Sequence, residues 1–406
     1  MLPGARILSL LLLLATATAA SAQPYTLLIK NGFLIDPGSN PQDTLDLAIR
    51  DNRIVKIAKH IDPRKAKKLL DARGMIVCPG LIDIHTHVFF GPDSNREYAG
   101  GPEGLHPDNF SFKTGVTTVV DAGSSGWRNF ETFKTRVIDH SKTRVLAFLN
   151  IVGAGMHGSP YEQDTTDMSS GPSAKIARQY AKDIVGFKVA HYRGTSWHPV
   201  DAAVKAGVIA NIPVMIDFGE HIPPMSIQQL FEKHLRPHDI FTHCFAQLGD
   251  REPVVDPATK KIKPFVITAQ QKGIVFDLGY GGISFAFSQA IPAVREDFLP
   301  NSISTDLHHG ATHDILDILS QFLAMGVDLP TVIAMTTWNP AQEIGRKELG
   351  RLQEGGIADI AILKIEEGHF QFTDHTGQTI AGKGKLQCIR TIKDGQTVYR
   401  RKSPGF

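Results

Sequence analysis

Cysteine is scarce in this sequence, which has only Cys78, Cys244 and Cys388 among its 406 residues. An odd number this small excludes a scaffold held together by disulfide bonds. Cys78 and Cys244 both lie in apolar, strand-like runs, where a free thiol packs as a small hydrophobic group. We therefore expect these two cysteines to be core residues.

Excess charge and repetition are also absent. The formal net charge is +2, and the chain has no basic block and no alternation of basic and aromatic residues. A nucleic acid is therefore not expected as a partner. We find no internal repeat and no low-complexity segment after residue 22. The remaining composition, 42% hydrophobic and 21% charged, is that of a globular protein with enough length for a large core.

Long apolar runs are missing except near the N-terminus, where "ILSLLLLLA" follows Arg6. This run is too short for a comfortable membrane span. A basic residue, a short apolar stretch and the tripeptide Ala20-Ser21-Ala22 before Gln23 are typical of a cleaved signal peptide. Residues 1–22 are therefore predicted to direct export to the periplasm or the exterior, with no stable membrane insertion after cleavage. A permanent anchor is the alternative.

Short alternating stretches occur at both ends of the chain. They include "YTLLIKNGFLID" and "LDLAIRDNRIVKIA" near the start, and "GGIADIAILKI" and "KLQCIRTIKDGQTVYR" near the end. Turn signals such as Asn31-Gly32 separate them, which is typical of small β-sheets. We predict one small flanking β domain built from both termini, residues 23–79 and 350–406.

The segment between these ends, residues 80–349, has a different rhythm. Apolar runs such as "GVTTVVDAG", "RVLAFLNIVG" and "GIVFDLG" recur, and helix-permissive stretches separate several of them. Strands that alternate with helices form parallel sheets. Eight such strands can be counted, which favours an α/β fold of the (β/α)8 TIM-like barrel type. A doubly wound open sheet is the alternative.

The first barrel strand ends in "PGLIDIHTH", which places His85 and His87 one residue apart. Residues i and i+2 of a strand point to the same face, so both imidazoles project together. In a barrel, the active site lies at the carboxyl ends of the strands. Two imidazoles directed at one point there suit a transition metal, although two unrelated polar residues could also end a strand.

Lys188 lies within the apolar run "VGFKVA". A buried ammonium is costly without a partner, and desolvation lowers its pKa toward a neutral, nucleophilic amine. Such an amine can capture CO2 as a carbamate, an anionic ligand able to bridge two cations. A lysine that pairs with a carboxylate, or that extends to solvent, is the alternative interpretation.

Ligand-type residues end further strands of the predicted barrel. His243 ends "DIFTH", Asp306 follows "NSIST", and Asp217 ends "IPVMID", with His221 four residues later. Any one of them alone could be a satisfied core or loop residue. Because five of the eight predicted strands carry such a residue near the same end, we interpret the set as a metal site.

These motifs, taken in chain order, resemble the amidohydrolase superfamily of metal-dependent hydrolases. The resemblance rests on "PGLIDIHTH", the lysine of "VGFKVA", "FTHCF", "STDLHHG", "TTWNPA" and "GRLQEGGIADI". It covers nearly all of residues 25–400. Within the superfamily the sequence looks most like the amidohydrolase/deacetylase group, which is related to dihydroorotases.

The resemblance implies a centre of two divalent metal ions, with zinc as the usual metal. His85, His87 and Asp306 would hold the first ion. The carbamate of Lys188 would bridge to a second ion that His243 also binds. In this mechanism Asp306 accepts a proton from water and passes it to the leaving group.

Three departures from the relatives concern the second ion and the substrate. Where relatives supply a histidine after the fifth strand, this chain has Asp217, with His221 as a substitute if its loop folds back. Relatives often have an arginine where this chain has Ala190, so His191 or Arg193 would contact the substrate instead. Tyr280 replaces a histidine that is common in relatives and is a third candidate for substrate binding.

We therefore predict hydrolysis of an amide or ester acyl bond of a small molecule, in the manner of a deacetylase or aminoacylase. The first alternative is a cyclic amidohydrolase similar to dihydroorotase or hydantoinase. The second is a secreted scaffold that has lost catalysis. Relatives often associate, so a homo-oligomer is a further possibility.

Overall fold

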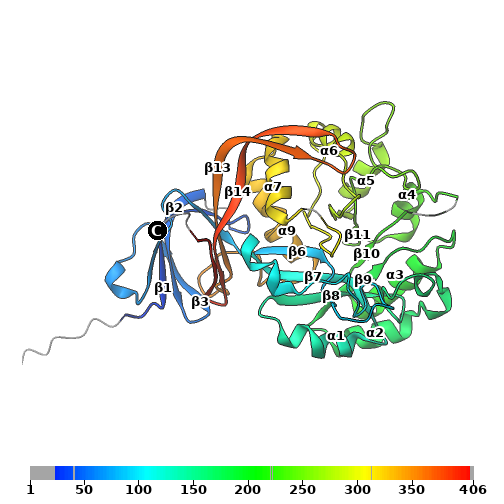
Figure 1. Ribbon diagram of the computed structural model, residues 1–406, viewed down its shortest axis with the longest axis horizontal. Coiled ribbons are helices and arrows are strands. Elements are labelled where there is room, and N and C mark those ends of the chain that lie inside the picture. Colours follow the sequence, from blue (N-terminus) through cyan, green and yellow to red (C-terminus); the bar gives the residue numbers. More distant parts are fainter. Residues whose placement is uncertain (1–22, 40–41, 220, 222, 312, 403–406) are drawn as a thin grey trace, which may run out of the picture.

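Two β-sheets organise the chain in the computed structural model, which describes residues 23–39, 42–219, 221, 223–311 and 313–402. One sheet is parallel and seven-stranded, and the other is mixed and eight-stranded. Figure 1 shows the mixed sheet at the left and the parallel strands with their helices at the right. The predicted signal peptide, residues 1–22, lies outside the described residues.

The parallel sheet keeps the order of the chain from one edge to the other, without a reversal. A doubly wound sheet reverses its strand order at a switch point, so the observed order favours a singly wound sheet. The strands of the parallel sheet are β6 (Leu81–Thr86), β7 (Val116–Gly126), β8 (Arg144–Asn150), β9 (Ile184–Val189), β10 (Val214–Ile216), β11 (Ile240–Phe241) and β12 (Val275–Phe276).

The segment 302–307 lies beside both edges of this parallel sheet. Ser302 forms a single parallel bridge with Asp277, directly after β12, and Leu307 forms one with Thr86 at the end of β6. A backbone hydrogen bond of 2.9 Å from His87 N to Leu307 O continues the second contact. The predicted eighth strand, "NSISTDL", therefore runs where a closed barrel needs it.

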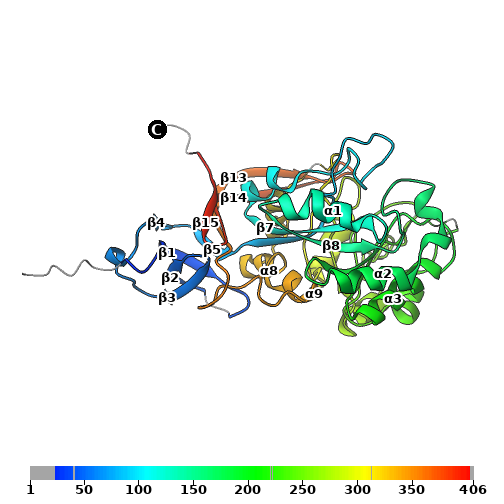
Figure 2. The ribbon, with the colours of Figure 1, turned by 90° about the horizontal axis from the view of Figure 1, so that it is seen from below.

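Burial on both faces explains the apolar runs. Every residue of β6, β7 and β9 is buried, as expected for parallel strands that helices cover. Figure 2 shows α2 and α3 side by side, close to β8 of the same sheet. The helices are α1 (Phe130–Arg136), α2 (Ser170–Gln179), α3 (His198–Ala210), α4 (Ile227–Gln229), α5 (Pro264–Gln271), α6 (Phe287–Arg295), α7 (Ile315–Ala324), α8 (Leu329–Ala334) and α9 (Trp338–Glu343).

The mixed sheet joins strands from both ends of the chain. Its order is β15-β14-β13-β5-β1-β2-β3, with β4 paired to β1. The antiparallel pairing of β5 with β13 joins strands from the two ends. That this sheet forms a separate flanking domain stays a prediction. Its strands are β1 (Leu27–Ile35), β2 (Gln42–Arg50), β3 (Arg53–Ala58), β4 (Leu69–Asp71), β5 (Ile76–Pro79), β13 (Ile360–Thr373), β14 (Thr379–Lys393) and β15 (Gln396–Arg400).

The hairpin of β13 and β14 extends from the mixed sheet across α7 toward α6 (Figure 1). Its turn is anchored to the first residue of α6 and to the segment just before it. Asp374 Oδ2 accepts a hydrogen bond of 2.7 Å from Phe287 N, and His375 Nδ1 lies 2.7 Å from Phe285 O. The hairpin thereby supports the loop after β12, which lies next to the candidate site.

All three cysteines are buried and unbonded to one another, which confirms the prediction for Cys78 and Cys244. Burial raises the pKa of both thiols, so they stay protonated and pack as apolar groups. Among the described residues, none of the helices has the length and apolar character to cross a bilayer.

Candidate metal centre

The carboxyl ends of the parallel strands bring the predicted ligands together. His85 lies in β6 and Lys188 in β9, while Asp217 directly follows β10 and His243 lies just beyond β11. Asp306 comes from the segment 302–307. His85, Lys188 and His243 are each at most 5% exposed. Residues far apart in the sequence therefore meet in one buried cluster, as the strand-end rule predicts.

The nitrogen and oxygen atoms in this cluster are spaced like the ligands of one cation. Asp306 Oδ1 lies 3.1 Å from His87 Nε2 and 3.4 Å from His85 Nε2. Lys188 Nζ lies 3.0 Å from His85 Nε2. Two ligands about 2.1 Å from a tetrahedral zinc are about 3.4 Å apart. In addition, ligand atoms of His85, His243 and Asp306 all lie within 4.8 Å of one another.

The outer nitrogen of each imidazole is already engaged. His85 Nδ1 lies 2.9 Å from Thr242 Oγ1, His87 Nδ1 lies 3.1 Å from Ser124 Oγ, and His243 Nδ1 lies 2.6 Å from the carbonyl oxygen of Gly279. Metal-binding histidines are held in this way through the ring nitrogen that faces away from the metal. Each Nε2 is thereby directed into the cluster, so these residues fit a divalent cation.

Burial favours the uncharged forms that a cation requires. Burial, and then the neighbouring Lys188, lowers the pKa of His85 to about 3, so its imidazole is neutral near pH 7. Burial also lowers the pKa of Lys188. A neutral imidazole can donate a lone pair to a metal, and a neutral amine can react with CO2.

Asp217 reaches His243 in the cluster. Asp217 Oδ2 lies 3.5 Å from His243 Nε2, whereas His221 packs on Phe218 with ring centroids 4.5 Å apart. Asp217 Oδ1 accepts a hydrogen bond of 2.5 Å from Arg251 Nη2. Burial alone would raise the pKa of Asp217, but the Arg251 guanidinium holds it well below its usual range.

Two residues that sequence reasoning missed support the cluster. Asp277 accepts hydrogen bonds from Thr242 at 2.7 Å and from Ser304 at 2.8 Å, and so fixes the hydroxyl that contacts His85. Asp277 also ends an apolar run, "GIVFD", so the strand-end rule could have found it. Arg251 lies in a loop without any pattern, and no sequence signal points to it.

Two glycines make room for the ligands. A Cβ at Gly281 would lie 2.6 Å from Asp306 Oδ2, and a Cβ at Gly123 would lie 2.6 Å from Lys188 Cγ. Both residues have positive φ angles, 58° and 94°, which glycine adopts without strain. Gly123 of β7 and Gly281 in the loop after β12 therefore give the candidate ligands the space that they occupy.

A pocket beside the cluster contains two of the predicted substrate residues. It is lined by Glu97, Tyr98, Ser159, Glu162, Gln163, His191 and Arg193. Tyr98 connects this pocket to the ligands, because its ring lies 4.5 Å from that of His87. His191 Nδ1 lies 2.8 Å from Glu162 Oε2. Burial would lower the pKa of His191, but Glu162 raises it to about 9.

Tyr280, the third predicted substrate residue, has a packing environment. Its ring stacks on Phe285 with centroids 4.6 Å apart, and its hydroxyl donates a hydrogen bond of 3.2 Å to Gln321 of α7. The side chain is 3% exposed. The structure therefore directs the Tyr280 hydroxyl to α7 and does not bring it to the candidate ligands.

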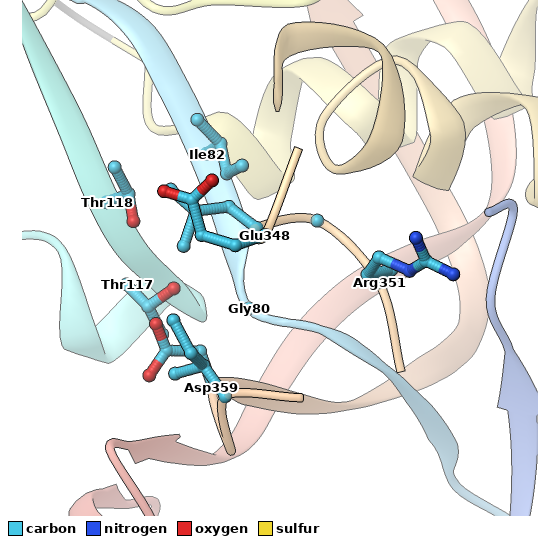
Figure 3. Close-up of a pocket in the computed structure, with 10 residues that line it drawn as sticks. Gly80, Ile82, Thr117, Thr118, Glu348, Arg351 and Asp359 are labelled. Carbon is cyan, nitrogen blue, oxygen red and sulfur yellow. The ribbon is translucent and has the colours of Figure 1, made fainter. Parts of the chain in front are cut away.

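A different hollow lies at the amino ends of β6 and β7. Figure 3 shows Gly80, Thr117, Thr118, Glu348 and Asp359 around it. The carboxylate of Asp359 is already paired there, with Oδ2 2.5 Å from Arg144 Nη1. This hollow is at the wrong end of the strands for the ligand cluster.

Comparison with known proteins agrees with this geometry. A family model described as "Amidohydrolase family" matches residues 286–398. The chain is 31% identical over 383 residues to a deacetylase of Enterococcus faecalis, covering 92% of this chain and 98% of that protein. It is 32% identical over 346 residues to a deacetylase of Brucella anthropi, covering 82% of this chain and 83% of that protein.

Two solved structures are similar over nearly the whole chain. A crystal structure of an adenine deaminase has a TM-score of 0.82 and 29% identity, and covers 93% of this chain and 100% of that one. A crystal structure of a dihydroorotase has a TM-score of 0.80 and 27% identity, and covers 92% of this chain and 99% of that one.

The fold and the cluster define a metal-dependent hydrolase with a small-molecule substrate. The chain belongs to the amidohydrolase family, whose members act on carbon–nitrogen bonds. This result confirms the resemblance that the sequence motifs indicated.

Proposed function

We propose that this protein is a zinc-dependent deacylase that hydrolyses an amide or ester acyl bond of a small molecule, similar to its deacetylase relatives. The observation that carries the proposal is the convergence of the Nε2 atoms of His85 and His87 on Asp306 Oδ1, at 3.4 and 3.1 Å. Imidazole and carboxylate are ligands that zinc accepts. The near full-length similarity to deacetylases supports the reaction type.

The side chains of the cluster have separable roles in this reaction. A bound cation supplies Lewis acidity, which lowers the pKa of water and polarises a carbonyl. Asp306 accepts the proton of the attacking water and delivers it to the departing amine or alcohol. His85 and His87 are held by Thr242 and Ser124 and keep their Nε2 lone pairs in place.

Lys188 is the residue for a carbamate. Its amine is buried beside His85, and Gly123 leaves space for its carbon chain. A carbamate on Lys188 would add a carboxylate to the cluster. This carboxylate could serve both the ion at His85 and a second divalent ion, which Asp217 and His243 would hold. Lys188→Ala should lower activity and metal content together, with partial rescue by short carboxylic acids. Unchanged metal stoichiometry would argue against this role.

The pocket lined by Tyr98, His191 and Arg193 is where we place the rest of the substrate. Tyr98, which lines this pocket, packs against His87. His191 and Arg193 offer cationic donors, and Glu97 and Glu162 offer acceptors. A small polar acyl compound, such as an N-acyl amino acid or an acylated hydroxy acid, would be recognised by these groups.

A substrate screen tests the proposal. Purified protein of measured zinc content would be assayed against N-acyl and O-acyl compounds, before and after removal of metal with a chelator. We expect hydrolysis of at least one acyl class, loss of activity after chelation and recovery with added zinc. A protein that purifies without metal and hydrolyses nothing would favour the non-catalytic scaffold.

Opening of a cyclic amide is the second candidate function. The similarity to a dihydroorotase structure at 27% identity over 92% of the chain favours it. However, the dihydroorotase sequence of Lactococcus lactis matches only 15% of this chain, whereas the deacetylases match most of it. Including dihydroorotate and hydantoins in the screen separates the two reactions, because only ring-opening enzymes act on them.

Two further expectations extend the proposal to architecture and location. We infer that the segment 302–307 is the eighth strand of a closed (β/α)8 barrel, and that residues 23–79 and 350–406 form its flanking domain. We also infer export, through cleavage before Gln23. N-terminal sequencing of the mature protein tests the cleavage, and an intact residue 1 in the purified, native-host protein would contradict it.

A further inference from the structure

Arg251 is a buried cation next to the candidate ligands. Its side chain is only 7% exposed, and it comes from the loop that follows His243. Nη2 donates a hydrogen bond of 2.5 Å to Asp217 Oδ1. A guanidinium is always protonated. The pair of Asp217 and Arg251 therefore has no net charge, although both groups are buried.

Arg251 engages only one oxygen of the Asp217 carboxylate. The other oxygen, Oδ2, lies 3.5 Å from His243 Nε2. His243 Nδ1 is 2.6 Å from the carbonyl oxygen of Gly279, and a carbonyl can only accept, so Nδ1 carries the proton. Nε2, on the other side of the ring, is thereby directed at Asp217 Oδ2.

The spacing of these two atoms is that of two ligands of one cation. Asp217 Oδ2 and His243 Nε2 are 3.5 Å apart, close to the value of about 3.4 Å for two ligands of one zinc. The arrangement therefore suits a divalent ion at this position.

The local backbone is adapted to the arginine. A Cβ at residue 219 would lie 2.7 Å from Arg251 Nε, so Gly219 allows the guanidinium to lie against the chain directly after Asp217. Among the described residues, Nε and Nη1 of Arg251 have no hydrogen-bond partner. The contact with Asp217 is thus the one that orients this side chain.

We propose that Arg251 is a positioning residue of the metal centre, which holds Asp217 Oδ1 so that Oδ2 and His243 Nε2 form a second cation site. This inference rests on the proposed function, because it assumes a cation at His85, His87 and Asp306. Arg251 acts through Asp217 and touches neither cation nor substrate. It also offsets the charge of a carboxylate that would otherwise be buried without a partner.

Metal titrations of single and double variants test this role. Zinc affinity would be measured by competition with a chromophoric chelator, and Co²⁺ absorption spectra would report the ligand geometry. The wild type should bind two equivalents. Arg251→Met should weaken one of them about 10- to 100-fold, the usual cost of losing a residue that orients a ligand, and should change the Co²⁺ spectrum. Arg251→Lys should recover part of the affinity, since it keeps the charge.

The double variant shows whether Arg251 acts through Asp217. Asp217→Asn should itself weaken the second equivalent, to an affinity that competition can still measure, and adding Arg251→Met should then cost nothing further. Arg236→Met is the matched control, since Arg236 Nη2 makes a similar contact of 2.7 Å with Asp239 at the amino end of β11. This control should leave both equivalents unchanged.

Some results would contradict the role of Arg251, and another would contradict the proposed hydrolase itself. Equal or tighter binding of both equivalents in Arg251→Met would overturn the inference, and tighter binding would mean that Arg251 competes with the cation. A single equivalent in the wild type, even at saturating zinc, would also overturn it while leaving the proposed hydrolase intact. If Arg251→Met does not fold, Arg251→Lys takes its place and should weaken one equivalent and change the Co²⁺ spectrum. Wild-type affinity and spectrum in Arg251→Lys would then overturn the inference, and so would additional weakening by Arg251→Lys in the Asp217→Asn background. No binding at all in the wild type would remove the proposed function itself.

Discussion

The two ends of the parallel strands bury polar groups in opposite ways. At the amino ends, opposite charges pair: Arg236 Nη2 lies 2.7 Å from Asp239 Oδ1 before β11, and Arg144 Nη1 lies 2.5 Å from Asp359 Oδ2 at the start of β8. At the carboxyl ends, the Nε2 atoms of His85 and His87 converge on one oxygen of Asp306.

The two ends differ in how their buried polar groups are paired. Buried polar groups are normally satisfied by hydrogen bonds, and the amino-end pairs achieve this among themselves. The carboxyl-end histidines use their Nδ1 atoms for support and leave their Nε2 atoms directed at a common point. The charge pairs at the amino ends therefore serve stability, and the two histidines with Asp306 at the carboxyl ends serve chemistry.

The largest expected effect is at the carboxyl ends. Asp306→Asn keeps the shape of the side chain but removes the proton acceptor, so kcat should fall by about 10²- to 10⁴-fold. Much of the zinc should be retained, because the two histidine ligands remain, and elemental analysis of the purified variant measures it. A rate near that of the wild type would remove Asp306 from its role as base.

A glycine substitution should have the next largest effect. The Cβ of Gly281→Ala would lie 2.6 Å from Asp306 Oδ2, and displacing a catalytic group by about 1 Å can cost about 100-fold in rate. Gly377→Ala is the control, because Gly377 also has a positive φ angle, 85°, but a Cβ added there would have no atom within 4 Å. Both variants should lose about 1 kcal/mol of stability, and only Gly281→Ala should lose activity. Equal kinetics of the two would contradict the packing against Asp306.

The amino-end pairs should affect stability alone. Arg236→Met removes two hydrogen bonds to the buried Asp239, of 3.0 and 2.7 Å, so the free energy of unfolding should fall by about 2 kcal/mol. At a temperature where the variant is folded, kcat/KM should equal that of the wild type. Chemical denaturation and steady-state kinetics measure the two quantities. A kinetic defect in the folded variant would contradict the prediction that the amino-end pairs affect stability alone.

The smallest expected effect concerns the Glu162–His191 pair in the pocket. Burial alone would lower the pKa of His191, yet Glu162 raises it to about 9. A raised folded-state pKa stabilises the protein below the unfolded value of about 6.5, and that contribution is lost as pH rises through 9. Glu162→Gln should therefore cost about 1 kcal/mol at pH 6 and nothing at pH 10, measured by denaturation. The same cost at both pH values would contradict the pairing.

Sequence predicts the ligand cluster well because the rules that place it are local. The period of two in a strand puts His85 and His87 on one face, and the carboxyl-end rule then brings Lys188 and His243 to the same place. The same rule accounts for Asp217, whose side chain does reach His243.

Contacts between distant loops are what sequence reasoning could not supply. Arg251 and Asp217 are 34 positions apart, and neither periodicity nor a motif relates them. Tyr280 shows the same limit. Its position after β12 did not reveal that its hydroxyl would reach Gln321, which is 41 positions away. Side-chain direction in loops depends on packing that only the folded chain defines.

Anomalous diffraction from a crystal grown with zinc and bicarbonate tests the central claim most directly. We predict a zinc peak about 2 Å from each of His85 Nε2, His87 Nε2 and Asp306 Oδ1. Ordered zinc found only elsewhere, or a cluster without any peak at saturating zinc, would contradict the account.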